Sequence, residues 1–189
     1  MDTTFLDPAS AATAERQHGR RALLERATVR EVLMGAQDNL TNVLAVVLGV
    51  TIGAGRAELV ALAGLAAAVA ESISMAGVLY TSTRAEQQLD ALQGEVSTRQ
   101  RLHPWLAGVI TGLAALAGGL LPLVPFAFLS LNAAVVCSLA FSLVALFTLG
   151  LTTAAITQRS PWRDGVRMVL IAGTAALSAA LIGALLRVD

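Results

Sequence analysis

The sequence predicts an all-α, polytopic membrane protein with five transmembrane helices. Of its 189 residues, 56% are hydrophobic and only 14% are charged, whereas soluble domains carry about 25% charged residues. No Asp, Glu, Lys or Arg occurs between Leu102 and Gln158, a run of 57 residues. Because one helical crossing of a bilayer needs about 20 apolar residues, two spans must share this run.

The spans can be placed in order along a domain that covers residues 31–189. They are predicted at about 33–52, 57–80, 104–121, 126–157 and 167–186. Gly53-Ala54-Gly55-Arg56 supplies a tight turn, so the first two spans form a helical hairpin. Pro104-Trp105 begins the third span, because Pro suits a first helical turn and Trp suits the headgroup level.

A polar leader over residues 1–30 precedes these spans. Its leucines alternate with arginines in a way that favours an amphipathic helix lying along the lipid headgroups, and a solvated helical leader is the alternative. Arginines in the flanks predict the orientation, because basic residues are retained on the cytoplasmic side. Five of these arginines lie in the leader, three in the segment from Thr81 to His103 and two in the connector 158–164. The opposite side holds only Arg56 and Arg187. The N-terminus is therefore predicted to be cytoplasmic and the C-terminus outside.

Composition also excludes several classes of function. The net charge is zero, so a nucleic-acid partner gains no support. The chain has no Lys, hence no P-loop, and it has no Cys-x-x-Cys or His-Glu-x-x-His motif, so we expect neither an enzyme nor a bound cofactor. All 13 basic residues are Arg in an Ala-rich chain, which suggests a bacterial genome of high GC content and the plasma membrane as location.

Two acidic residues lie inside the first two spans, Asp38 and Glu71. A charged side chain at the centre of a membrane helix costs about 2.5 to 3.5 kcal/mol, and such residues are therefore functional candidates. At 1.5 Å per residue, both lie roughly 8 to 13 Å from the cytoplasmic ends of their spans. Two structural alternatives remain open: Asp38 as the N-cap of a helix that starts at Asn39, and Glu71 as a protonated packing residue.

Helical spacing adds further candidate ligands to this pair. Met34 and Asn42 share a face with Asp38, and Met75 shares a face with Glu71. Carboxylate oxygens suit Mg, Mn and Fe(II), whereas a thioether favours softer ions, so the mixed set predicts a borderline divalent transition metal. The carboxylates would take up protons when the metal leaves. Met75 as an ordinary core residue is the alternative.

A second acidic pair follows in the polar segment from Thr81 to His103. Glu86 and Asp90 are four residues apart and could receive a metal on its way from the cytoplasm. The alternative is a solvated helix face.

Three stretches of the sequence form a recognisable set: Gly35-Ala36-Gln37-Asp38-Asn39-Leu40, Ser74-Met75-Ala76 followed by Tyr80, and Ser160-Pro161 followed by Gly165. The first two resemble the first two spans of the vacuolar iron transporter family, and the third resembles that family's approach to its last span. The resemblance implies a five-helix protomer, a homodimer with the path between subunits, and export of cytosolic Fe(II) or Mn(II) in exchange for protons. By matched position, Asp38 and Met75 would be ligands in that path.

This chain departs from the family pattern at three places. Asn39 replaces the usual Gly, and Leu79 replaces an acidic residue often found before the Tyr. The segment from Thr81 to His103 is too short to form the long Glu-rich metal-binding segment of many relatives, so the chain is expected to be a short member. The leading hypothesis is thus a proton-coupled metal exporter embedded in lipid, and the alternative is a non-transporting membrane scaffold or assembly partner.

Overall fold

The structure, a computed structural model, describes the backbone of residues 8–92 and 103–187 and the side chains of residues 29–92 and 103–187. Within these ranges the chain forms five long α-helices and one 3₁₀ helix, with no strand. They are α1 (Pro8–Ala54), α2 (Ala57–Leu92), α3 (Pro104–Leu120), η1 (Leu121–Ala127), α4 (Leu131–Thr157) and α5 (Pro161–Leu185). The predicted all-α fold class is confirmed.

Five helical segments are long and apolar enough to cross a membrane, one for each long helix, and the third continues from α3 through η1. The five segments are Val29–Ala54, Ala57–Leu92, Pro104–Ala127, Leu131–Thr157 and Pro161–Leu185. A helix satisfies its backbone hydrogen bonds internally, which is what lets such a segment cross hydrocarbon. The five predicted transmembrane helices are therefore confirmed within the part of the chain that the structure describes.

The connections between helices follow from the residues that form them. Gly55 adopts φ 62° and donates its N–H to Thr51 O at 2.9 Å, which ends α1 in a left-handed glycine cap. Pro104 occupies the first turn of α3 as predicted. After α3, the residues from Leu121 to Ala127 form the 3₁₀ helix η1, which contains Pro125, so α4 begins at Leu131 rather than near residue 126.

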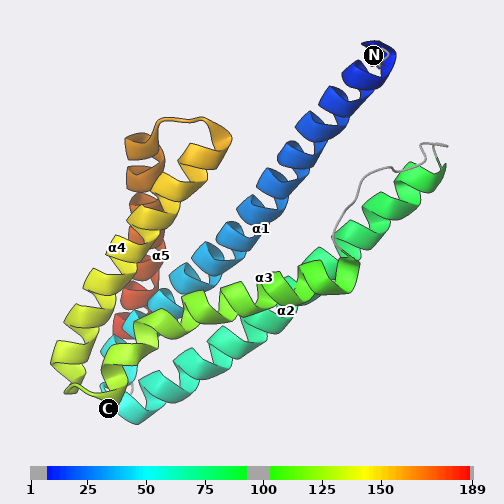
Figure 1. The fold of residues 1–189 in the computed structure, drawn as a ribbon. Coiled ribbons are helices and arrows are strands. Elements are labelled where there is room, and N and C mark those ends of the chain that lie inside the picture. The colour runs from blue at the N-terminus through cyan, green and yellow to red at the C-terminus, as the bar shows by residue number, and fades with distance from the viewer. Residues whose placement is uncertain (1–7, 93–102, 188–189) are drawn as a thin grey trace.

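Helices α1 and α2 are longer than the spans predicted from hydropathy. The polar leader is not a separate helix, because α1 runs unbroken from Pro8, and α2 continues through the charged segment as far as Leu92. Residues 81–92 contain no Gly or Pro and several strong helix formers, so nothing in that segment interrupts the helix. Both extensions project from the same end of the molecule (Figure 1).

Helix α1 occupies the centre of the fold and packs against α2, α3, α4 and α5. The pair formed by α2 and α3 lies on one side of it, and the pair formed by α4 and α5 on the other (Figure 1). Two small apolar clusters line the half of α1 nearer Ala54. The first consists of Val43, Val47, Val60 and Ala68, and the second of Leu40, Leu146 and Ala172.

Glycines allow the neighbouring helices to approach α1 and α2 closely. A Cβ at Gly49 would lie 3.0 Å from Ala179 O, and a Cβ at Gly183 would collide with the Gly49 carbonyl, so α5 packs directly on α1 there. A Cβ at Gly112 would lie 3.0 Å from Ser72 O of α2. Gly49 with Gly53 and Gly108 with Gly112 are pairs of small residues at helix-packing spacing, and contacts within the chain cover both pairs.

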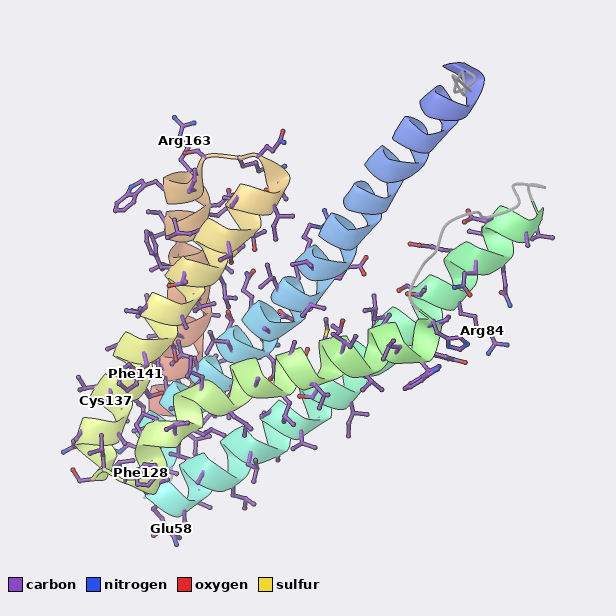
Figure 2. The ribbon with its side chains drawn as sticks, viewed as in Figure 1. Glu58, Arg84, Phe128, Cys137, Phe141 and Arg163 are labelled. Carbon is purple, nitrogen blue, oxygen red and sulfur yellow. The ribbon has the colours of Figure 1, made fainter. Side chains whose placement is uncertain are left out.

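The segments rich in arginine lie at one end of the molecule. The start of α1, the end of α2 and the connection between α4 and α5 are at the upper end of Figure 1, and the C-terminus and the turn between α1 and α2 are at the lower end. Arg163 and Arg84 accordingly lie far from Glu58 (Figure 2). This alternation agrees with the topology that the arginines predict, and the assignment of the upper end to the cytoplasm stays a prediction.

Candidate metal-binding site

Asp38 lies in the middle of α1, sixteen residues before its last residue, Ala54. The alternative interpretation of Asp38 as a helix N-cap is therefore wrong. One turn to either side of it on the same face lie Met34 and Asn42, and all three side chains are exposed on the outer surface of the single chain. Met34 is 50% exposed. In a bilayer this face would meet lipid, unless water, an ion or another protein covers it.

Glu71 lies at nearly the same level of the membrane on α2. It is fourteen residues after Ala57, where α2 begins, so Asp38 and Glu71 lie about 24 and 21 Å from the turn that joins the helices. The Glu71 side chain is half-buried, and its carboxyl group lies close enough to that of Asp38 for the two to interact. The structure thus brings the two predicted acidic residues together.

Met75 reaches from α2 toward α1 one turn beyond Glu71. Its Cε lies 3.5 Å from the point where a Cβ of residue 35 would be, so the end of the Met75 side chain lies beside Gly35 of α1. Gly35 is buried and precedes Asp38 by three residues, which places it about one turn away on α1. The thioether therefore lies within about one helical turn of the acidic pair.

Asn39 is the residue of this region that sequence reasoning assigned no role. It is completely buried, although it follows the exposed Asp38 directly. Its Nδ2 lies 2.8 Å from Ala115 O of α3, and 3.0 and 3.1 Å from Ala68 O and Ser72 Oγ of α2. Because the amide has two hydrogens, one donates to Ala115 O and the two acceptors of α2 share the other. The sequence does contain a signal for this junction, because Asn39 and Ser72 are the polar residues that come immediately after the two acidic ones.

Glu86 and Asp90 lie on the extension of α2, well away from the acidic pair. They are fifteen and nineteen residues after Glu71, which corresponds to about 22 and 28 Å along the helix axis. Glu86 is exposed and Asp90 is half-buried, and both make interactions with other groups. The structure therefore separates this pair from Asp38 and Glu71, and residues 93–102, with Glu95, lie outside the described residues.

No group of three or more His, Cys, Asp or Glu side chains is clustered in the described parts of the chain. One protomer thus offers two carboxyl groups and a thioether rather than a closed cage. The rings of His103 and Trp105 lie near each other at the start of α3, tilted by 57° with centroids 6.2 Å apart. Cys137 is a half-buried free cysteine on α4.

Comparison with known proteins finds a matching family model and similar chains. The family model described as the VIT family matches residues 29–97 and 91–184. An uncharacterised protein of Methanocaldococcus jannaschii is 24% identical over 154 residues, which are 74% of this chain and 80% of that protein. The vacuolar iron transporter homolog 1 of rice, Oryza sativa subsp. japonica, is 30% identical over 156 residues, which are 75% of this chain and 66% of that protein. Since the family model covers most of the sequence, this integral membrane protein belongs to the VIT family.

Proposed function

We propose that this chain exports Fe(II) or Mn(II) from the cytosol by proton antiport, along a path lined by Asp38, Glu71 and Met75. Membership of the VIT family and the similarity to a vacuolar iron transporter homologue support a metal transporter rather than an enzyme. The observation that carries the proposal is the close pair of carboxyl groups beside a thioether within two membrane-spanning helices.

The charges of this pair suit exchange of a divalent cation for protons. A buried or lipid-facing site is least costly when its net charge is close to zero. Two ionised carboxylates neutralise one divalent cation, whereas the empty pair needs protons to lower its charge. Binding of the metal therefore releases protons and binding of protons releases the metal, which is the coupling that antiport requires.

The ligand types favour a transition metal over Mg(II) or Ca(II). Carboxylate oxygens are hard ligands, and the thioether of Met75 is a soft one that a borderline ion accepts. A few oxygens with one weak sulfur also bind reversibly, as a transport path demands.

A second copy of the chain would complete the site. The face formed by Met34, Asp38 and Asn42 is exposed in a single chain at the level of the membrane, and contact with lipid there is costly for a carboxylate and an amide. An isologous homodimer would turn this face toward the same face of its partner, so that each ligand occurs twice around the path. Met34 and Asn42 would then supply additional ligands.

The arginine-rich end of the molecule, which includes Arg84 and Arg163, would face the cytoplasm of a bacterial cell, with the protein in the plasma membrane. Glu86 and Asp90, on the extension of α2, would then lie on the side from which the metal arrives.

Transport into proteoliposomes tests the proposal. We expect Mn(II) flux under an imposed pH gradient with the wild-type chain, at least tenfold lower flux with Asp38→Ala plus Glu71→Ala, and unchanged flux with Glu58→Ala. Glu58 is a suitable control because it is exposed at the far end of α2, where it pairs with Arg56 at 3.9 Å. Equal flux in the double variant would remove the pair from the mechanism. Absence of flux in the wild type, together with a stable hetero-complex after gentle detergent extraction, would favour the scaffold alternative.

A further inference from the structure

We propose that Asn39 is a positioning residue, which holds α1 against α2 and α3 and thereby sets the separation of the Asp38 and Glu71 carboxyl groups. The expected effect of Asn39 on metal binding rests on the proposed function. Its effect on the placement of the helices can be measured without any metal.

The hydrogen bonds of Asn39 have one consistent arrangement. Ser72 Oγ donates its own hydrogen to Ala68 O at 2.5 Å, so toward Asn39 it acts as an acceptor. Nδ2 therefore faces three acceptors, namely Ala68 O, Ala115 O and Ser72 Oγ, on two different helices. A reversed amide would place Oδ1 against two carbonyl oxygens, which repel it. The side chain is thus fixed in its orientation, and it joins three helices at one level.

The opposing helix is shaped to receive this amide. A Cβ at Gly119 of α3 would lie 2.7 Å from Nδ2 and 2.8 Å from both Cγ and Oδ1 of Asn39. One residue earlier, a Cβ at Gly118 would collide with the Ala36 carbonyl of α1. The two glycines let α3 approach α1 at the position where α1 carries the amide, so the fit depends on both helices.

Stability alone does not explain the presence of this amide. The Oδ1 atom of Asn39 is buried and has no hydrogen-bond partner among the described residues. A buried acceptor without a partner costs free energy, and an apolar side chain at this position would not incur that cost. A buried polar group of this kind is best attested as a device that specifies register between helices.

The register that Asn39 specifies is the one that brings the two acidic residues together. Asp38 and Glu71 each immediately precede one end of the Asn39 to Ser72 hydrogen bond. Neighbouring helical residues point about 100° apart, so Asn39 and Ser72 are buried, whereas Asp38 is exposed and Glu71 is half-buried. A rotation or slide of α1 against α2 would break this hydrogen bond and change the distance between the carboxyl groups. Metal ions differ in their preferred ligand distances, so the selectivity of the site would change with it.

Two variants and a matched control test the inference. Asn39→Ala removes all contacts of the amide. Ser72→Ala removes only one of them, together with the bond from Ser72 Oγ to Ala68 O within α2, which provides a milder perturbation if Asn39→Ala does not fold. Ser138→Ala is the control, because Ser138 is a completely buried polar residue of α4, away from the three-helix junction. None of the three changes a proposed ligand.

The first readout is Mn(II) binding to detergent-solubilised protein, together with its ratio to Mg(II) binding. We expect Asn39→Ala to raise the Kd for Mn(II) by about tenfold or more, as loss of an orienting group around a metal site typically does, and to lower the preference for Mn(II) over Mg(II). Ser138→Ala should leave both values within about twofold of wild type. An unchanged Kd and an unchanged ratio in a folded Asn39→Ala protein would overturn the inference.

The second readout needs no metal. Spin labels on cysteines at the exposed positions Val29 of α1 and Leu89 of α2, in a Cys137→Ser background, report the distance between the two helices. We expect a shifted or broader distance distribution with Asn39→Ala and an unaltered one with Ser138→Ala. Superimposable distributions would overturn the positioning role. Failure of the wild type to bind Mn(II) would instead refute the proposed function, and the distance measurement would still decide whether Asn39 aligns the helices.

Discussion

Gly119→Ala should destabilise the fold by about 2 kcal/mol, although the same change in an open helix position stabilises. The added Cβ would lie 2.7 to 2.8 Å from three atoms of the Asn39 amide, which is held by neighbours and cannot move aside. Overpacking of this kind costs about 1 to 3 kcal/mol, and displacement of the amide would weaken hydrogen bonds worth about 1 kcal/mol each. The higher helix propensity of Ala offsets only about 0.8 kcal/mol of this destabilisation.

Gly77→Ala is the matched control for this prediction. Gly77 is also a helical glycine, and a Cβ there would meet nothing within 4 Å. Gly77→Ala should therefore stabilise the protein by about 0.5 to 1 kcal/mol. The free energy of unfolding can be measured for both variants by denaturant titration in detergent micelles, with circular dichroism as the signal.

A double variant isolates the contact itself. In Asn39→Gly plus Gly119→Ala the amide is absent, so the second substitution should cost about 1 to 3 kcal/mol less than it does alone. If Gly119→Ala proves as stable as Gly77→Ala, or if the two substitutions are additive, the close contact between α1 and α3 described here is refuted.

Three further changes test other parts of the structure. Glu71→Gln should weaken Mn(II) binding about tenfold and lower the number of protons released on binding by about one. Calorimetry in buffers of different ionisation enthalpy measures both quantities, and an unchanged number of released protons would contradict the proposed coupling. Met34→Cys in a Cys137→Ser background should form a disulfide-linked dimer under mild oxidation on a non-reducing gel, whereas a monomer alone would argue against a dimer through this face. Gly183→Leu should lower the stability by about 3 kcal/mol in thermal unfolding, because the leucine side chain would enter the contact of α5 with α1. Gly173→Leu is the control and should have little effect, because a Cβ at Gly173 would meet nothing within 4 Å.

The meeting of Asp38 with Glu71 could be predicted in part from the sequence. The tight turn at Gly55 and the constant rise of a helix place both residues about equally far from that turn. Spacing along each helix also placed Met75 beside Glu71. The role of Asn39 could not be predicted in this way, because the direction in which a residue points depends on how α1 is rotated against its neighbours.

Gly49 and Gly53 are a second example of what the sequence does and does not predict. The sequence indicates that another backbone can approach there, and this is correct. It does not say which backbone, and the structure places α5 of the same chain on this face. Backbone proximity is a local property of glycine, whereas the choice of partner depends on all helices together.

The number of spans, their order and the hairpin at Gly55 were determined by the sequence alone, because hydropathy and backbone hydrogen bonding within a helix are local properties. Which face of each helix turns inward was decided only by the tertiary structure. In lipid the inner and outer faces of a helix are both apolar, so the pattern that distinguishes them in a soluble protein is missing. Close packing of glycines and the hydrogen bonds of one buried amide decide it here, and they exist only once α1, α2 and α3 have come together.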